Sequence, residues 1–112
     1  MNRKKLVTEM GRIDRDTFAQ AEKLPLVVVL DNVRSLHNVG SVFRTSDAFR
    51  VERIMLCGIT ATPPSAEIHK TALGAEDVVE WQYFESTMDA VAALREQGYN
   101  VYSIEQIGRA HV

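Results

Sequence analysis

The chain has 112 residues, of which 46% are hydrophobic and 25% are charged, and its formal net charge is −2. This composition is typical of one globular domain, and it excludes a disordered chain, a repeat protein and a coiled coil. No segment approaches the ~18 apolar residues of a membrane span, and the basic start of the chain lacks the apolar stretch of a signal peptide. We therefore expect a cytoplasmic protein without a membrane partner.

The charges are unevenly distributed along the chain. Residues 1–50 hold nine Lys or Arg against six Asp or Glu, whereas residues 51–112 hold four against nine. This asymmetry favours a polyanionic partner for the first half, although a chance scatter of solvated charges explains it equally well.

The single cysteine, Cys57, excludes an internal disulfide and a cysteine-based zinc cluster. It ends a predicted strand, so we expect it to be a small buried apolar residue. His69 and Lys70 match no pattern of metal ligands or nucleophiles, and no metal site is predicted.

The first half of the chain contains one predicted strand followed by one predicted helix. Before them, residues 1–23 carry apolar positions three to five residues apart, which predicts a helical arm. The run from Leu26 to Leu30, opened by Pro25, is apolar without alternation, which indicates a strand covered on both faces of a parallel sheet. After a polar loop, Asn38 is the predicted N-cap of a helix that reaches Phe49.

The second half continues the alternation of strands and helices. Its predicted elements are a strand over residues 51–58, a short helix over 65–73, a strand over 78–84, a helix from the Ser86 cap to Gly98, and a strand over 99–104. Trp81 and Tyr83 fall on one face of the third strand, where core packing is favoured over base stacking.

This order of elements predicts an α/β fold with a doubly wound, Rossmann-like parallel sheet. In such sheets, ligands bind at the carboxyl ends of the strands. The loop over residues 31–38 and the helix that follows it are therefore expected at the working edge of the molecule.

The start of this helix has the properties of an anion site. A helix N-terminus exposes unpaired N–H groups and a partial positive charge, and Gly40 is expected to let a ligand backbone approach closely. Arg34 in the loop and Arg44 one turn after Gly40 predict a phosphate clamp. An exposed ion pair with Asp47 is an equally good explanation for Arg44. Helix capping alone explains the presence of Asn38.

A resemblance to a known family rests on the same segment. The sequences NVRS at residues 32–35 and NVGSVFRT at residues 38–45 resemble the first signature motif of SpoU-type (TrmH family) RNA ribose 2′-O-methyltransferases, in which an asparagine precedes an arginine by six residues. The similarity also includes EMGR at residues 9–12 and KTALGA at residues 70–75, and it covers nearly the whole chain. A dinucleotide-binding loop would need three glycines, whereas this loop has one.

The resemblance implies transfer of a methyl group from S-adenosyl-L-methionine to a ribose 2′-hydroxyl of tRNA or rRNA by a homodimeric enzyme. It implies a central catalytic role for Arg44, supported by Asn38. A guanidinium with a pKa above ~12 is a poor base, so we expect Arg44 to hold a phosphate and to stabilise the forming 2′-alkoxide. Further RNA contacts are expected at Arg34, His37, Gly40 and Ser41, and cofactor contacts at Ser103, Ile104 and Glu105.

The later motifs and the carboxy-terminal trefoil knot of the family are missing from the sequence. We therefore predict an arm at residues 1–23, the amino-terminal part of a methyltransferase domain at residues 24–106, and a non-native tail at residues 107–112, where the resemblance stops. The 112 residues alone are expected to be inactive. Two alternatives stay open at this point: a non-catalytic RNA-binding module that uses the same basic loop, and another kind of nucleotide-binding α/β domain.

Overall fold

The computed structural model describes residues 23–104. The predicted tail and all of the predicted arm except Lys23 lie outside these residues. The described elements are β1 (Leu24–Asp31), α3 (Leu36–Ala48), β2 (Val51–Cys57), α4 (Ala66–Ala72), the 3₁₀ helix η1 (Ala75–Asp77), β3 (Trp81–Phe84) and α5 (Thr87–Glu96). Among them, no helix is long and apolar enough to cross a membrane.

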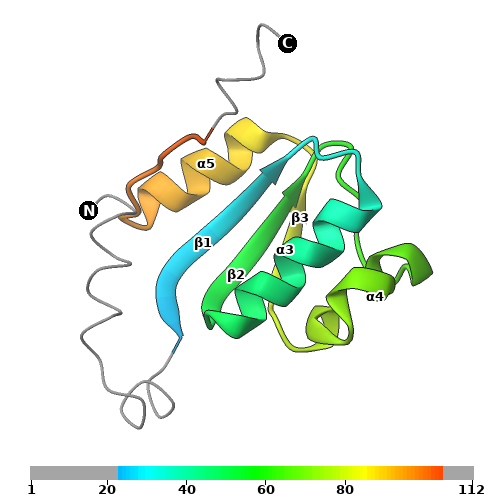
Figure 1. The fold of residues 1–112 in the computed structure, drawn as a ribbon. Coiled ribbons are helices and arrows are strands. Elements are labelled where there is room, and N and C mark those ends of the chain that lie inside the picture. The colour runs from blue at the N-terminus through cyan, green and yellow to red at the C-terminus, as the bar shows by residue number, and fades with distance from the viewer. Residues whose placement is uncertain (1–22, 105–112) are drawn as a thin grey trace, which may run out of the picture.

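The three strands form a parallel sheet in the order β1-β2-β3. Figure 1 shows α3 and α4 on one face of this sheet and α5 on the other. The predicted α/β fold with helices on both faces of a parallel sheet is therefore confirmed. Because consecutive parallel strands need crossover connections, the helices between them come to lie against the sheet faces.

The central strand β2 is apolar on both faces, and it divides the core into two layers. Ile54 and Leu56 belong to a larger cluster under α3 and α4, whereas Met55 and Cys57 belong to a smaller cluster under α5. All four side chains are buried. The alternation follows from the two-residue period of a strand, which sends successive side chains to opposite faces.

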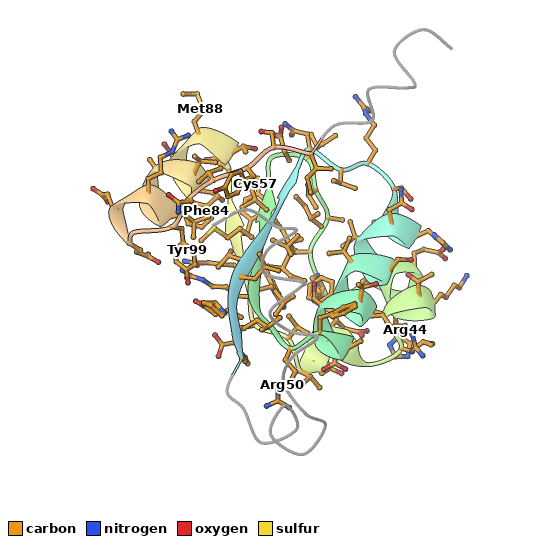
Figure 2. All side chains as sticks on the ribbon, turned by 60° about the vertical axis from the view of Figure 1, so that its left-hand side comes forward. Arg44, Arg50, Cys57, Phe84, Met88 and Tyr99 are labelled. Carbon is orange, nitrogen blue, oxygen red and sulfur yellow. The ribbon has the colours of Figure 1, made fainter. Side chains whose placement is uncertain are left out.

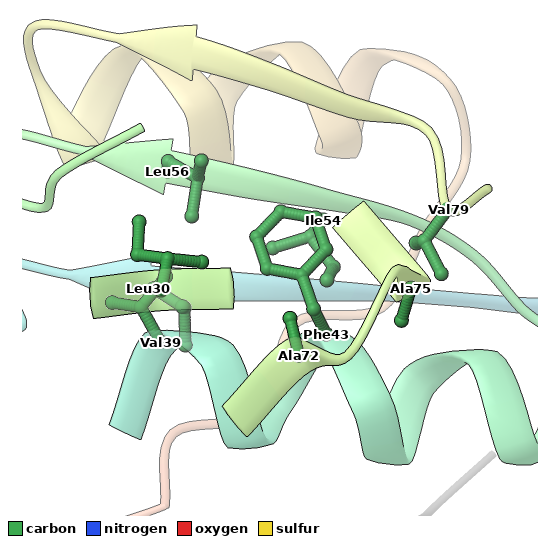
Figure 3. Close-up of a cluster of buried hydrophobic side chains, with 9 residues drawn as sticks. Leu30, Val39, Phe43, Ile54, Leu56, Ala72, Ala75 and Val79 are labelled. Atoms are coloured by element: carbon green, nitrogen blue, oxygen red, sulfur yellow. The ribbon is translucent and has the colours of Figure 1, made fainter. Parts of the chain in front are cut away.

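Phe43 of α3 fills the centre of the larger cluster and is fully buried (Figure 3). Trp81 packs partly buried against the same cluster, as predicted. Tyr83 does not: its side chain is exposed, and its hydroxyl donates a hydrogen bond of 2.7 Å to the Gly58 carbonyl. The expectation of core packing is therefore right for Trp81 and wrong for Tyr83, because the sheet ends at β3 and no element covers its outer end in the described part.

The strand predicted from residue 78 begins only at Trp81. The backbone N–H groups of Val78 and Val79 both donate to the Ala75 carbonyl, which continues the turn of η1. Val79 nevertheless reaches the core, where it is 5% exposed. Its apolar character reflects burial in a turn rather than a place in the strand.

The predicted fourth strand at residues 99–104 is wrong for the described structure, in which this segment forms no strand. Gly98, at a φ of +92°, reverses the chain, and the Tyr99 N–H donates back to the Leu94 carbonyl at 3.0 Å. Tyr99 is thus held at the end of α5, and the residues after it form no ladder of hydrogen bonds with β1.

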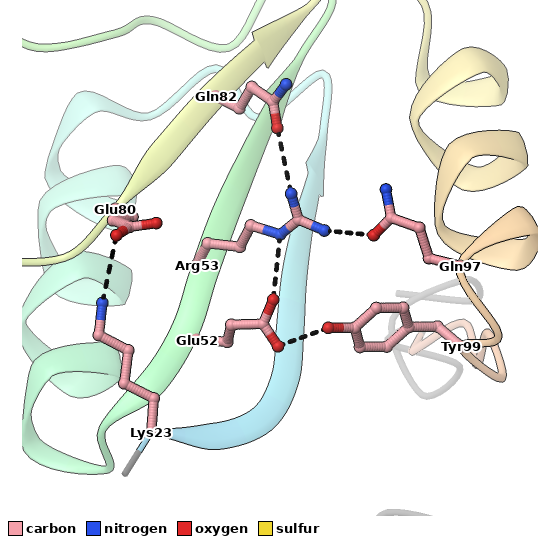
Figure 4. Close-up of polar contacts among 7 residues, drawn as sticks. All are labelled: Lys23, Glu52, Arg53, Glu80, Gln82, Gln97 and Tyr99. Carbon is pink, nitrogen blue, oxygen red and sulfur yellow. Dashed lines mark hydrogen bonds and ion pairs between the residues drawn. The ribbon is translucent and has the colours of Figure 1, made fainter.

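A group of polar side chains attaches Tyr99 and Gln97, at the end of α5, to β2 (Figure 4). The Tyr99 hydroxyl donates to the Glu52 carboxylate, and this hydrogen bond raises the pKa of Tyr99 above its usual value. Arg53 donates to the side-chain oxygens of Gln97 at 2.7 Å and Gln82 at 3.4 Å. These contacts explain how the end of α5 is anchored at the amino-terminal half of the sheet.

The contact between α3 and α4 depends on Gly40. A Cβ atom at this position would lie 1.9 Å from the Thr71 Oγ1 atom and 2.4 Å from the Ile68 carbonyl oxygen. Thr71 also donates a hydrogen bond of 2.9 Å to the His37 carbonyl, which holds α4 on the first turn of α3. The expectation that Gly40 admits a ligand backbone is therefore wrong, because α4 occupies that space.

Substitution Gly40→Ala is predicted to destabilise the fold. Alanine in a helix gains about 1 kcal/mol over glycine, but the clash with the Ile68 backbone forces α4 to move, and overpacking costs about 1–3 kcal/mol. We expect a net loss in the free energy of unfolding, measured by urea denaturation. The control is Ser41→Ala on the same helix, which should be nearly neutral. Equal stability of Gly40→Ala and the wild type would contradict this packing role.

Candidate functional site

The start of α3 is set by Ser35. Its hydroxyl oxygen accepts a hydrogen bond of 3.0 Å from the Asn38 N–H, which makes Ser35 the N-cap. The prediction of Asn38 as the cap is wrong by three residues, because a serine at the end of the loop already satisfies this donor. The Asn38 side chain is exposed, and its carboxamide is not used for capping.

The loop that carries Arg34 directly follows β1 at the carboxyl edge of the sheet, as predicted. A second loop, which follows β2, holds it in place. The Thr60 hydroxyl accepts a hydrogen bond from the Val33 N–H at 2.9 Å and donates one to the Leu30 carbonyl at 3.2 Å. The Asn32 side-chain oxygen accepts a hydrogen bond from the Ile59 N–H at 2.9 Å.

The contact between these two loops includes two residues with a left-handed backbone conformation. Asn32 has a φ of +53° and Gly58 has a φ of +66°. A Cβ atom on Gly58 would lie 2.0 Å from the Asn32 side-chain oxygen, so the glycine is needed for both its conformation and its lack of a side chain. Sequence reasoning placed Asn32 in the motif but missed Thr60, since a lone threonine in a loop carries no signal of burial.

Asp31 connects the same edge to α5. Its Oδ1 atom accepts hydrogen bonds from the Thr87 hydroxyl at 2.6 Å and from the Asn32 side chain at 2.9 Å. The neighbouring Cys57 is buried, as predicted. Burial raises the pKa of its thiol, a hydrogen bond with Thr87 lowers it in part, and the charge of Asp31 raises it further.

The two predicted phosphate-binding arginines are available to a ligand. Arg34 and Arg44 are both exposed, and neither forms a salt bridge or hydrogen bond with its side chain to any residue in the range 23–104. The alternative ion pair between Arg44 and Asp47 is thus absent from the structure. Figure 2 shows Arg44 on the side of the sheet away from α5.

Helix geometry decides which predicted residues share a face of α3. His37, Ser41 and Arg44 are spaced i, i+4 and i+7, so they fall on one face of the helix, beside α4. Asn38 comes one residue after His37 and is therefore rotated by about 100° from that face. The structure therefore brings three of the predicted residues onto one face of α3, and Asn38 lies off that face.

The predicted cofactor residues do not form a binding site within the described part of the chain. Ser103 and Ile104 are exposed in a segment without strand structure, and Glu105 lies outside the described residues. A cofactor of nucleoside size needs a concave, partly apolar site. These residues therefore do not fit S-adenosyl-L-methionine as they stand. No group of three or more possible metal ligands occurs within residues 23–104.

Comparison with known proteins supports the family. The model of the SpoU rRNA Methylase family matches residues 25–112. The chain belongs to this family. The 23S rRNA (guanosine-2′-O-)-methyltransferase RlmB of Vibrio parahaemolyticus is 31% identical over 96 residues, which cover 86% of this chain and 39% of RlmB. RlmB of Nitrosomonas europaea is 36% identical over 73 residues, or 65% of this chain and 28% of that protein.

Solved structures of SpoU and TrmH proteins share the fold of this SpoU-family chain. A TrmH-family protein of Porphyromonas gingivalis has a TM-score of 0.62 and 32% identity, covering 74% of this chain and 35% of that one. The SpoU methyltransferase AviRb of Streptomyces viridochromogenes, in complex with AdoMet, has a TM-score of 0.56 and 25% identity, covering 77% and 33%. The chain spans less than half the length of each of these relatives.

Chemical modification of Cys57 tests whether its thiol is buried at the carboxyl edge of the sheet. Iodoacetamide is expected to modify Cys57 at pH 8 at least about tenfold more slowly in the native chain than in urea, because burial and the raised pKa keep the thiol neutral and inaccessible. The free energy of unfolding should fall as the pH rises above ~8.5, since the unfolded thiol then ionises first. Equal modification rates in both states would contradict the buried position.

Proposed function

We propose that this chain forms the RNA-facing part of an S-adenosyl-L-methionine-dependent RNA ribose 2′-O-methyltransferase. The observation that carries the proposal is a pair of exposed arginines in a SpoU-family chain: Arg34 just before α3 and Arg44 within it, both without side-chain partners among residues 23–104. The name of RlmB specifies a guanosine 2′-O-methyltransferase of 23S rRNA, and AviRb has been solved with AdoMet. A homodimer in the cytoplasm that acts on rRNA or tRNA completes the proposal.

Arg34 and Arg44 have distinct roles in this proposal. Arg34, in the loop before the helix, binds a phosphate of the RNA backbone, where the N-terminal N–H groups of α3 add a favourable partial charge. Arg44 binds the phosphate of the target nucleotide with its planar fork of donors. His37 and Ser41 lie on the same face of α3 as Arg44 and extend the RNA contact.

The chemical step places negative charge on the ribose 2′-oxygen as its proton leaves. A guanidinium is a cation and a poor base, so Arg44 stabilises this charge and does not remove the proton. The Asn38 carboxamide is exposed and has no hydrogen-bond partner within residues 23–104, and we assign it a supporting role as a donor beside the same ribose. S-adenosyl-L-methionine supplies the methyl group, and no reaction step through it follows from residues 23–104.

The role of Arg44 can be measured in a chimera in which residues 25–104 replace the matching segment of Vibrio parahaemolyticus RlmB. We expect incorporation of labelled methyl groups into rRNA, and a loss of about 100-fold or more for both Arg44→Ala and Arg44→Lys, because lysine lacks the bidentate fork. Arg95→Ala, on α5 across the sheet, is the matched control and should leave turnover unchanged.

Near-normal turnover of Arg44→Lys would rule out the bidentate role. A chimera that binds rRNA without incorporating methyl groups would favour the non-catalytic RNA-binding module instead.

A further inference from the structure

The loop that carries Arg34 contacts the core through Val33, whose partly buried side chain packs against the larger cluster. Its backbone leaves β1 at Asp31, and Arg34 and Asn32 are exposed at the protein surface. A binding arginine on a loop must be held in place, because every rotatable bond that orders on RNA binding costs entropy. Hydrogen bonds from the loop after β2 supply part of that order.

Thr60 supplies two of the fixing contacts through one buried oxygen. Its side chain is 27 residues from Val33 and 30 from Leu30 in sequence, yet its hydroxyl bonds to both backbones and the residue is 3% exposed. The hydroxyl therefore links Leu30, near the end of β1, to Val33, the residue before Arg34. Without it, the Val33 N–H and the Leu30 carbonyl would each lose a partner in a region with little access to water.

We propose that Thr60 is a positioning residue that acts through Arg34: its hydroxyl fixes the loop after β1 so that Arg34 meets the RNA phosphate in one orientation. The choice of RNA as the ligand rests on the proposed function, whereas the role of Thr60 in holding the loop does not. The Asn32 hydrogen bond to the Ile59 N–H is the second attachment of the same loop, on the other side of the bend.

The test uses the 112-residue chain with Thr60→Val, which keeps the shape of the side chain and removes the hydroxyl, and Thr60→Ser, which keeps the hydroxyl. Thr62→Val is the matched control, because the Thr62 side chain forms no hydrogen bond within the described range. Asn32→Gly, which tolerates the left-handed backbone, serves as an independent variant if Thr60→Val does not fold.

Binding to a short fluorescein-labelled RNA hairpin is measured by anisotropy over a range of salt concentrations. Thr60→Val is expected to weaken binding roughly threefold to tenfold and to reduce the salt dependence by about one phosphate contact, as Arg34→Ala does. Thr60→Ser should restore both quantities. In the Arg34→Ala background, Thr60→Val should cause no further loss, because the two residues act through one contact.

Equal losses from Thr60→Val with and without Arg34 would overturn the proposal, because the effect would then be general destabilisation. Amide hydrogen exchange provides a readout independent of RNA: the Val33 N–H should exchange about tenfold faster in Thr60→Val and at an unchanged rate in Thr62→Val. Unchanged exchange at Val33 would also overturn it. A wild-type chain that fails to bind RNA would refute the proposed function, and the exchange rates would then decide the positioning role alone.

Discussion

Burial of β2 on both of its faces is the constraint on which the rest of the structure depends. A strand with apolar side chains on both faces must be covered twice, so helices pack on each side and the neighbouring strands run parallel to it. That arrangement fixes the carboxyl ends of β1 and β2 side by side. The loops after these two strands consequently meet, and their meeting defines the candidate site.

The site is an exposed, positively charged surface attached to a rigid edge rather than a closed pocket. Arg34 and Arg44 have no protein partners within the described chain, while the backbone beneath them is tied by Ser35, Asn32 and Thr60. Such a division suits recognition of a polyanion, because the charges stay free for phosphates while the scaffold limits the entropy lost on binding. The acidic residues between positions 51 and 104 do not pair with either arginine.

Packing between α3 and α4 changes how the motif is understood. The sequence predicts that the glycine of the NVGSVFRT segment admits a ligand, but Gly40 faces α4, and the side chain of Thr71 fills the space beside it. The motif therefore combines two features: one face of α3 is exposed, and Gly40 on the adjoining face lets α4 pack closely. Close helix packing of this kind requires the absence of a Cβ atom.

Much of this protein could be predicted from sequence because the signals are local. The apolar run of β1, the periodicity of α3 and the spacing of Asn38 and Arg44 each depend on neighbours in the chain, and they indicated the parallel α/β fold and the family. Contacts between distant segments could not be predicted. The tertiary structure decided the contact of Gly40 with α4, the hydrogen bonds of Thr60 across 27 and 30 residues, and the absence of a strand over residues 99–104. In each case the packing or hydrogen-bond partners come from elements far away in sequence.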